Sequence, residues 1–238
     1  MDLDIDNIYV CSDLHLALGD SNKLDLIMNF ISNLSLGDEF VIAGDMFEVF
    51  VGKLELQLTW QKYLLDYFRR AIVEQKRIFY VEGNRDYFIS KLRGDVFIDV
   101  YPEVCYRGNN RIMIVHGDLI NSKDRLYCLW RKVVKNSIIY KLSCIFPNKV
   151  VVRFIYWLER KLKMVNKRYK NYIPYEQIHN FIKNQREVDL IISGHFHKFI
   201  EIHYKDSVFV SLPSWVDYPN VLKVWLDSGN ILYKLIRL

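Results

Sequence analysis

Short polar motifs built from aspartate, asparagine and histidine recur along this 238-residue chain, and each directly follows an apolar, strand-like segment. In chain order they are Asp13-Leu14-His15, Gly44-Asp45, Gly83-Asn84-Arg85-Asp86, His116-Gly117-Asp118 and Gly194-His195-Phe196-His197. Four of the chain's six histidines fall in these motifs. Side chains of these types, delivered by the ends of buried strands, indicate a hydrolase that uses two metal ions.

The expected ligands divide into two sets that share Asp45, whose carboxylate can give one oxygen to each ion. The two sets are Asp13, His15, Asp45 and His197 for one ion, and Asp45, Asn84, His116 and His195 for the other. Carboxylate, amide and imidazole ligands suit Mn²⁺, Fe²⁺, Zn²⁺ or Mg²⁺, and Mn²⁺ is our first choice. A water molecule shared by two ions about 3.5–4 Å apart would lose a proton near neutral pH and attack phosphorus in line.

Each motif alone is weak evidence for a metal site. Gly-Asp commonly marks a turn, and a histidine on an apolar segment is commonly a core residue. The joint pattern carries the interpretation, because every motif follows a β-rich segment. His179 and His203 lie outside the motifs and are interpreted as structural.

The elements that must position these motifs alternate between strand and helix in the first third of the chain. Apolar runs at Ile8–Cys11, Phe40–Ala43 and Arg77–Val81 predict buried strands. Apolar spacings of three and four residues predict helices over Ser21–Leu34 and Leu54–Glu74. This alternation indicates α/β layering.

Further along, the pattern becomes richer in strands. The predicted elements are strands at Val96–Ile98, Val104–Tyr106 and Arg111–Val115, a helix at Tyr175–Asn184, a strand at Val188–Ile192, and strands at Ile200–Tyr204, Val208–Leu212, Val221–Leu226 and Ile231–Ile236. We expect the last four strands to form an antiparallel meander that closes a second sheet.

Composition bounds the class of protein. A chain with 51% hydrophobic and 26% charged residues is typical of a globular protein with one sizeable core. Its four scattered cysteines contain no C-x-x-C pair, so neither a structural zinc site nor a disulfide framework is indicated. We expect no signal peptide and no membrane span, and a cytoplasmic setting.

Residues 123–172 differ from the rest and are named the lid here. They hold 14 Lys and Arg side chains against two acidic ones, a net charge of +12, whereas the whole chain carries +5. Apolar and aromatic residues are interleaved with the basic ones, which predicts helices broken near Pro147. We therefore expect a core formed by residues 1–122 and 173–238, with a basic, apolar helical insertion at 123–172.

The order and spelling of the motifs resemble the calcineurin-like metallophosphoesterase superfamily. The strings Ser12–Leu16, Gly44–Glu48 and Gly83–Tyr87 are similar to its UDP-2,3-diacylglucosamine pyrophosphohydrolase branch. The resemblance implies an α/β fold, namely a four-layer α-β-β-α sandwich with an inserted helical lid, and a di-manganese centre. It also implies hydrolysis of the pyrophosphate of UDP-2,3-diacylglucosamine in lipid A synthesis, releasing UMP and 2,3-diacylglucosamine 1-phosphate.

The same resemblance implies roles for individual residues. Asn84, Arg85 and His116 would act in catalysis, and Arg85 stands where many phosphatases of the superfamily carry a histidine. A permanently charged guanidinium suits a pyrophosphate leaving group. The substrate contacts would be Asn84, Arg85, His195, Asp124, Tyr127, Arg131, Arg160, Lys167 and Lys170. The chain departs from the branch at Glu82, where a histidine is frequent.

The late lid carries Arg160, Lys163, Lys167 and Lys170 at a spacing that places them on one helical face. Such a stripe is either a solvated face, a pyrophosphate clamp or a contact with anionic lipid. The expected partners are the lipid nucleotide and the anionic surface of the inner membrane, with peripheral attachment. We expect neither an obligate protein partner nor nucleic acid.

Two other classes of function stay open from the residues. A nuclease or soluble phosphodiesterase or phosphatase could use the same two ions, with the basic lid as a nucleic-acid surface. Aromatic residues buried in the lid would count against that function. A non-catalytic scaffold of the same fold is disfavoured, because a scaffold has no need of the complete ligand set.

Overall fold

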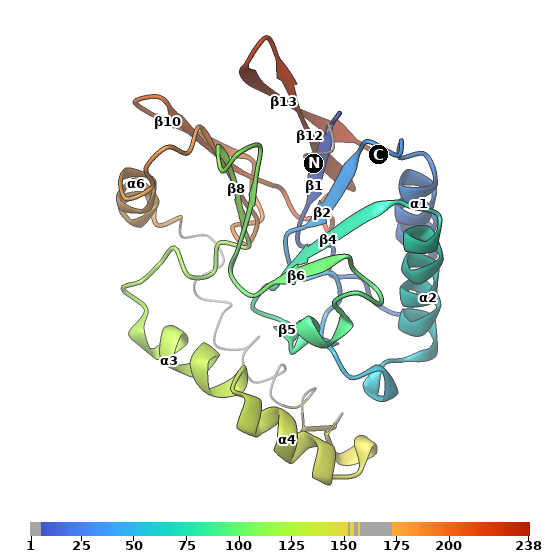
Figure 1. The fold of residues 1–238 in the computed structure, drawn as a ribbon. Coiled ribbons are helices and arrows are strands. Elements are labelled where there is room, and N and C mark those ends of the chain that lie inside the picture. The colour runs from blue at the N-terminus through green and yellow to red at the C-terminus, as the bar shows by residue number, and fades with distance from the viewer. Residues whose placement is uncertain (1–5, 152, 155–156, 158–172) are drawn as a thin grey trace.

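Two β-sheets lie face to face in the centre of the molecule, and helices cover their outer faces (Figure 1). The computed structural model describes residues 6–151, 153–154, 157 and 173–238. The layers are helices, sheet, sheet and helix, so the predicted four-layer α-β-β-α sandwich is confirmed.

The larger sheet is mainly parallel. In the described part of the chain its order is β13-β12-β1-β2-β4-β6. Its strands are β1 (Ile8–Cys11), β2 (Glu39–Ile42), β4 (Arg77–Val81), β6 (Asp99–Tyr101), β12 (Asn220–Asp227) and β13 (Asn230–Arg237). Strands β1, β2, β4 and β6 pair in parallel, whereas β12 and β13 join antiparallel. The carboxyl ends of β1, β2 and β4 consequently meet at one edge.

The smaller sheet brings two more parallel strands to the same end of the molecule. Its order is β10-β11-β9-β8-β7, and β8 pairs in parallel with β9. The strands are β7 (Val104–Arg107), β8 (Ile112–Val115), β9 (Leu190–Ser193), β10 (Ile200–Tyr204) and β11 (Ser207–Ser211). A two-stranded pair, β3 (Phe50–Val51) and β5 (Asp86–Tyr87), lies beside the site loops.

The helices cover the sheets as their apolar stripes require. Helices α1 (Ser21–Ser32) and α2 (Thr59–Val73) pack on the larger sheet through one apolar cluster, and α6 (Tyr175–Lys183) packs on the smaller sheet through another. A third cluster, with members such as Val10, Ala43, Ile114 and Ile192, fills the space between the sheets. The segment Leu54–Leu56 is a short 3-10 helix, so the second predicted helix begins later, at Thr59.

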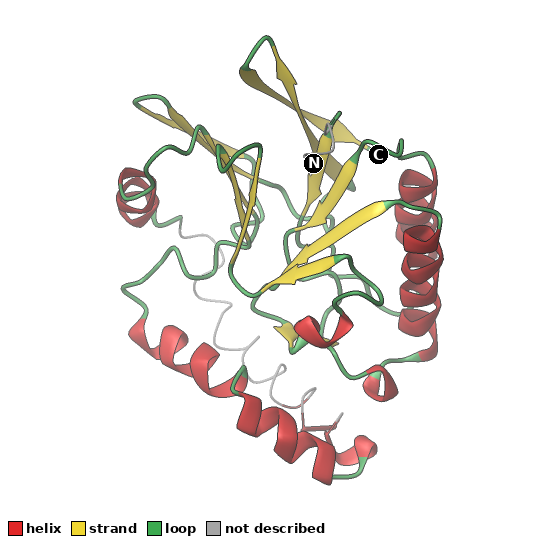
Figure 2. Cartoon of the chain, in the orientation of Figure 1, coloured by secondary structure: helices red, strands yellow, loops and turns green. Residues whose placement is uncertain are grey.

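The described part of the lid lies along the end of the sandwich at which the carboxyl ends of β1, β2 and β4 meet (Figure 2). Its described helices are α3 (Arg125–Val134) and α4 (Ser137–Ile145), which confirms helices before Pro147. In the part of the chain that the structure describes, no helix has both the length and the apolar content to cross a membrane.

Two predicted strand assignments are wrong. Val96–Ile98 is not a strand: Val96 and Phe97 are both buried in the helix-side cluster, and the strand begins at Asp99. The last four strands do not form one meander either. Strands β10 and β11 belong to the smaller sheet, with β11 parallel to β9, while β12 and β13 belong to the larger one. Alternating hydrophobicity identifies strands and their buried faces, but not their partners.

Candidate metal centre

Five loops converge where the parallel strands of both sheets end. The loop after β1 carries Asp13 and His15, the loop after β2 carries Asp45, and the loop after β4 carries Asn84 and Arg85. The loop after β8 carries His116, and the loop after β9 carries His195 and His197. The structure thus brings together every ligand that the sequence predicted.

Asp13, His15 and His197 form the first potential ligand group. The Asp13 Oδ1 atom lies 3.1 Å from Nε2 of His197 and 3.6 Å from Nε2 of His15, and the two Nε2 atoms are 3.3 Å apart. Donors of one octahedral ion at about 2.1 Å are spaced roughly 3 Å apart, which these separations approach. One side of the Asp13 carboxylate is already occupied, because Oδ2 accepts hydrogen bonds from Ser12 Oγ and the His195 amide. Among the described residues, the buried Oδ1 accepts no hydrogen bond.

Asp45, Asn84, His116 and His195 lie in the second position. The Oδ1 atom of Asn84 is 2.9 Å from Nε2 of His116 and 3.0 Å from Nδ1 of His195, and Oδ2 of Asp45 is 3.8 Å from Nε2 of His116. The His116 Nδ1–H group donates to the carbonyl of Ala43 at 2.9 Å. In the neutral ring that bond leaves a lone pair on Nε2, which then faces the lone pairs of Asn84 Oδ1. A cation held between these atoms would satisfy both, so the donor set fits a divalent metal ion.

Asp13 also belongs to the second group. Ligand atoms of Asp13, Asp45 and His116 all lie within 4.8 Å of one another, as do those of Asp13, His15 and His197. Oxygen and imidazole nitrogen donors without a cysteine suit hard or borderline divalent ions. The residues fit two such cations.

Most of the predicted ligands sit on left-handed backbone. The φ angles are +53° at Asp13, +44° at His15, +54° at Asp45, +69° at His195 and +57° at His197. Such a backbone costs a residue with a side chain about 1–3 kcal/mol, and it persists only where its surroundings enforce it. Here the Asp13 amide donates to Gly44 O, and the His15 amide donates to Asp45 O. This concentration of strained backbone marks a functional site.

Two of the glycines beside the ligands are required by close approach. A Cβ atom on Gly83 would come within 2.3 Å of Oδ1 of Asp45, and one on Gly44 would come within 2.7 Å of the Gly83 backbone. The loops after β2 and β4 therefore touch backbone to backbone. This contact places Asp45 beside Asn84.

Burial and the neighbouring charges together set the charge of the ligands. Removal from water lowers the pKa of His15 to about 3 and that of His195 to about 4, so both imidazoles are neutral at pH 7. Burial alone would raise the pKa of Asp13, but His197, whose Nε2 lies 3.1 Å from Oδ1, and the other nearby imidazoles hold that pKa well below its usual value. Burial raises the pKa of Asp45. Neutral imidazoles beside buried carboxylates favour a cation.

Arg85 extends beside this centre. Its Nε lies 3.6 Å from Oδ2 of Asp45, and its Nη1 lies 3.4 Å from Oε2 of Glu48. The Arg85 backbone amide donates to Oδ1 of Asp45 at 2.8 Å. The guanidinium is therefore adjacent to the predicted ions, as a group that stabilises phosphate charge must be.

Asp86 was not among the predicted site residues, yet it organises the loops. Its fully buried Oδ2 accepts hydrogen bonds from the Asp45 amide at 2.9 Å, the Gly83 amide at 2.7 Å and the Tyr80 hydroxyl at 2.9 Å. The Tyr80 oxygen in turn accepts from the Met46 amide. The aspartate of Gly-Asn-Arg-Asp was the available signal, because a buried carboxylate needs donors and adjacent loop amides supply them.

The lid residues predicted to contact substrate have partners within the protein. The Asp124 carboxylate caps α3 by accepting from the Tyr127 amide. The Tyr127 hydroxyl donates to Asp118, and the buried Arg131 Nε lies 2.8 Å from the same carboxylate. These contacts anchor α3 to the loop that carries His116. Substrate contact by the three residues stays a prediction.

The basic stripe lies outside the described residues. Its members are Arg160, Lys163, Lys167 and Lys170, so their predicted role stays a prediction. His203, which we interpreted as structural, is exposed and pairs with Glu201 away from the ligands.

Comparison with known proteins gives both a family and named relatives. The profile of the calcineurin-like phosphoesterase family matches residues 7–199. A UDP-2,3-diacylglucosamine hydrolase of Wigglesworthia glossinidia brevipalpis is 26% identical over 227 residues, covering 93% of this chain and 88% of the relative. A protein of the same name from Neisseria gonorrhoeae is 27% identical over 234 residues, covering 93% and 95%. A solved dimetal phosphatase from Danio rerio has a TM-score of 0.52 at 12% identity, covering 98% of this chain and 96% of that one, which is a likeness of fold alone.

Proposed function

Because the chain belongs to the calcineurin-like phosphoesterase family, we propose that it hydrolyses the pyrophosphate of UDP-2,3-diacylglucosamine to UMP and 2,3-diacylglucosamine 1-phosphate. The family makes the chain a metal-dependent hydrolase of phosphoester or pyrophosphate bonds. The observation that supports UDP-2,3-diacylglucosamine as the substrate is similarity over 93% of the chain to relatives named UDP-2,3-diacylglucosamine hydrolase. Arg85 beside Asp45 supports it, because a pyrophosphate leaving group needs charge stabilisation.

Different residues of the site would have different roles in this pyrophosphate hydrolysis. Two Mn²⁺ ions, when bound by the two groups described above, would supply an activated water and neutralise phosphoryl charge. The Ala43 carbonyl holds the His116 ring so that its Nε2 faces Asn84. Asn84 lies between His116 and His195 and would orient a phosphoryl oxygen. Arg85 would stabilise negative charge on the phosphates in the transition state.

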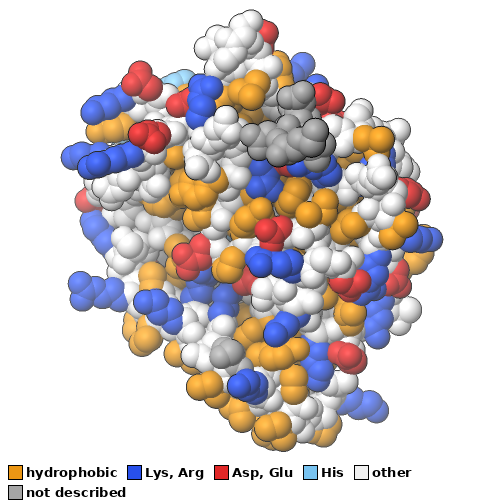
Figure 3. All heavy atoms as spheres, in the orientation of Figure 1, with side chains coloured by type: hydrophobic (Ala, Val, Ile, Leu, Met, Phe, Trp, Pro, Cys, Tyr) orange, Lys and Arg blue, Asp and Glu red, His pale blue; other side chains and the backbone are white. Residues whose placement is uncertain are grey.

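The lid offers an apolar surface of the kind that acyl chains would need. On α3, Leu126, Leu129 and Val133 are 82%, 61% and 48% exposed, and the spacing i, i+3, i+7 places them on one face. Figure 3 shows hydrophobic side chains gathered at this end of the molecule, with Lys and Arg between them. We propose that this surface holds the acyl chains and that the basic residues draw the protein to the anionic inner-membrane surface from the cytoplasm.

The direct test is product identity. Protein loaded with Mn²⁺ is incubated with UDP-2,3-diacylglucosamine, and the nucleotide product is identified by chromatography and mass spectrometry. We expect UMP in equal amount to the lipid monophosphate. Absence of turnover with a full complement of Mn²⁺, or release of UDP, would refute the proposed reaction.

A phosphodiesterase acting on nucleic acid is the second candidate, because one observation favours it. Phe154 and Trp157 are more than half exposed, and their rings stack at a centroid distance of 5.9 Å. Displayed aromatic rings in a basic segment are typical of surfaces that bind single strands. Efficient cleavage of a single-stranded oligonucleotide by the Mn²⁺-loaded protein, with no reaction on the lipid nucleotide, would establish this function instead.

The apolar face of α3 gives a separate prediction. Replacing Leu126, Leu129 and Val133 together by glutamine should lower kcat/KM for the lipid nucleotide at least about tenfold, since burying one such side chain contributes about 1.5–3 kcal/mol. Hydrolysis of bis(p-nitrophenyl) phosphate, which has no acyl chain, should change little. The matched control is Val73→Gln, on the 84% exposed residue of α2. Equal losses on both substrates would show that α3 does not recognise acyl chains.

A further inference from the structure

Helix α3 is fixed to the core at both ends, on loops that carry site residues. Tyr127 near its start and Arg131 in its last turn both bind Asp118, two residues beyond His116. Near its end, Lys135 reaches the loop that follows β4 and leads to Asn84. The helix therefore joins the loop after the smaller sheet's β8 to the loop after the larger sheet's β4.

The contact at Lys135 is largely shielded from water and directional. Its ammonium donates to the carbonyl oxygen of Gly83 at 2.8 Å and lies 3.2 Å from Oε2 of Glu82. The side chains of Lys135 and Glu82 are only 14% and 6% exposed. The other carboxylate oxygen of Glu82 accepts from the Ser90 amide, and Arg131 donates to the Glu82 carbonyl. Glu82 thus holds the lysine in place from the core side.

The atom that Lys135 binds determines the orientation of the next residue. The Gly83 carbonyl and the Asn84 amide belong to one rigid peptide plane. The Gly83 amide on the other side is held by Asp86, and a side chain on Gly83 would collide with Asp45. Because hydrogen bonds hold both the amide and the carbonyl of Gly83, the orientation of the backbone at Asn84 and Arg85 is fixed.

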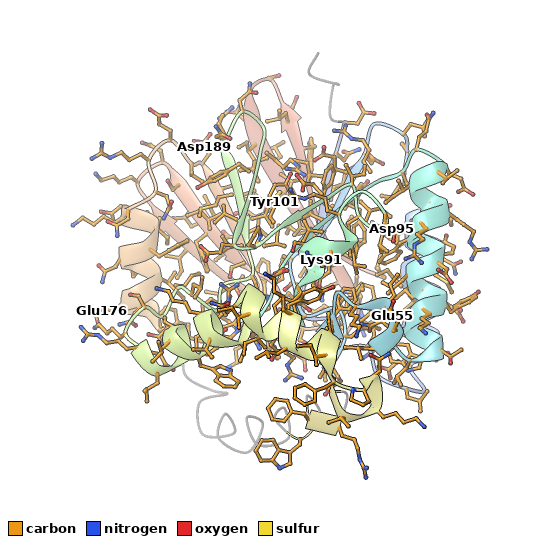
Figure 4. All side chains as sticks on the ribbon, turned by 60° about the horizontal axis from the view of Figure 1, so that its bottom comes forward. Glu55, Lys91, Asp95, Tyr101, Glu176 and Asp189 are labelled. Carbon is orange, nitrogen blue, oxygen red and sulfur yellow. The ribbon has the colours of Figure 1, made fainter. Side chains whose placement is uncertain are left out.

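Stabilisation of the fold does not by itself explain the ion pair between Lys135 and Glu82. A buried ion pair is often no more stabilising than apolar side chains of the same size, because both charges must leave water. Other contacts already attach the lid. Tyr140 packs on Phe88 with ring centroids 5.0 Å apart. Lys91, which is labelled in Figure 4, lies 5.1 Å from the centroid of the Tyr140 ring. Val134 and Val151 join the apolar cluster around Val51. A directional pair at Gly83 therefore indicates a requirement for orientation.

We propose that Lys135 and Glu82 are positioning residues, which hold the Gly83–Asn84 peptide so that Asn84 and Arg85 face the reacting phosphate. Helix α3 then helps to hold the catalytic residues in position, in addition to forming part of the lid. This inference rests on the proposed hydrolase activity of the site, but it is independent of the lipid part of the substrate.

The test is a double-mutant cycle on Lys135→Met and Glu82→Gln, each close in shape to the residue it replaces. For each Mn²⁺-loaded variant, kcat and KM are measured with UDP-2,3-diacylglucosamine and with bis(p-nitrophenyl) phosphate, together with bound metal and Tm. Each single change should lower kcat about 10- to 100-fold on both substrates, as loss of a supporting contact around a metal site does. KM and the two bound ions should be retained. The double variant should be little worse than either single one, because the same interaction is already lost.

Controls separate positioning from stability. Lys62→Met removes an exposed lysine of α2, which has no role in the proposed site or membrane surface, and should leave kcat unchanged. Lys135→Arg, which keeps a donor and a charge, should recover most of the activity lost in Lys135→Met. A lowered Tm with wild-type kcat in both single variants would overturn the proposal. If Lys135→Met does not fold, the milder Glu82→Gln decides, and a wild-type kcat there overturns it equally.

The two substrates keep this inference distinct from the proposed function. A wild-type protein that hydrolyses bis(p-nitrophenyl) phosphate but not the lipid nucleotide would refute the proposed substrate. The effect of Lys135 and Glu82 would then still be measured on the small phosphodiester.

Discussion

Asp45→Ala is expected to remove nearly all activity, a loss of more than about 10³-fold in kcat, because the carboxylate belongs to both predicted ion positions. The fully buried side chain has Oδ2 3.8 Å from His116 Nε2 and Oδ1 bound by the Arg85 amide. Ligand atoms of Asp13 and His116 lie within 4.8 Å of it. Metal analysis of the purified variant should show loss of both ions.

Thermal unfolding checks the same prediction without an activity assay. Added Mn²⁺ should raise the Tm of the wild-type protein, since an ion that binds only the folded state stabilises it. Added Mn²⁺ should leave the Tm of the Asp45→Ala variant unchanged. Because Asp45 has a left-handed backbone, which disfavours alanine by roughly 1–2 kcal/mol, Asp45→Gly, which tolerates that backbone, is made beside it.

Asp38→Asn is the matched control for Asp45. Asp38 is also buried, but it precedes β2, at the other end of the strand that delivers Asp45, and it holds Asn7 and the Ser35 amide. Its substitution should lower Tm and leave the metal content intact. Two ions bound to a folded Asp45→Ala protein would disprove the shared role.

Arg85→Ala is expected to keep its metals and lose about 10²–10³-fold in kcat, the scale of removing one donor that stabilises transition-state charge. The guanidinium lies 3.6 Å from Asp45, so it is close to the reacting phosphate without being a ligand. The backbone amide that binds Asp45 Oδ1 remains in the alanine variant. Steady-state kinetics with parallel metal analysis measure the effect.

The conservative partner is Arg85→Lys. A lysine keeps the charge but not the planar pair of donors, so it should recover only part of the lost rate. Arg70→Ala, on the last turn of α2, is the control for loss of a surface arginine and should retain full activity. A kcat near the wild-type value in Arg85→Ala would show that this arginine serves structure rather than catalysis.

The sequence was sufficient to predict the α/β layering, which the fold confirms, and to name candidate ligands that the structure brings together. Each ligand motif follows a short apolar run, and such a run in this setting is a buried strand. Parallel strands end at a common edge, so Asp13, Asp45 and Asn84 had to converge once β1, β2 and β4 were neighbours. The chemistry of the donors then limited the site to divalent cations.

Other features could not be predicted because they depend on which surfaces meet. Periodicity placed the C-terminal strands, but the division between two sheets depends on pairing of β11 with β9 and β12 with β1. The failure at Val96 and Phe97 has a related cause, since two consecutive buried residues fit a loop turned into the core as well as a strand.

The sequence by itself identified the candidate donors, because a local strand-and-loop pattern carries both the residue type and its position at a strand end. Only the tertiary structure decided what holds those donors. The contacts of Asp86 with the Asp45 amide and of Lys135 with the Gly83 carbonyl span 41 and 52 residues. Backbone atoms are the partners in both contacts, and every residue offers the same backbone groups, so no side-chain pattern could identify them.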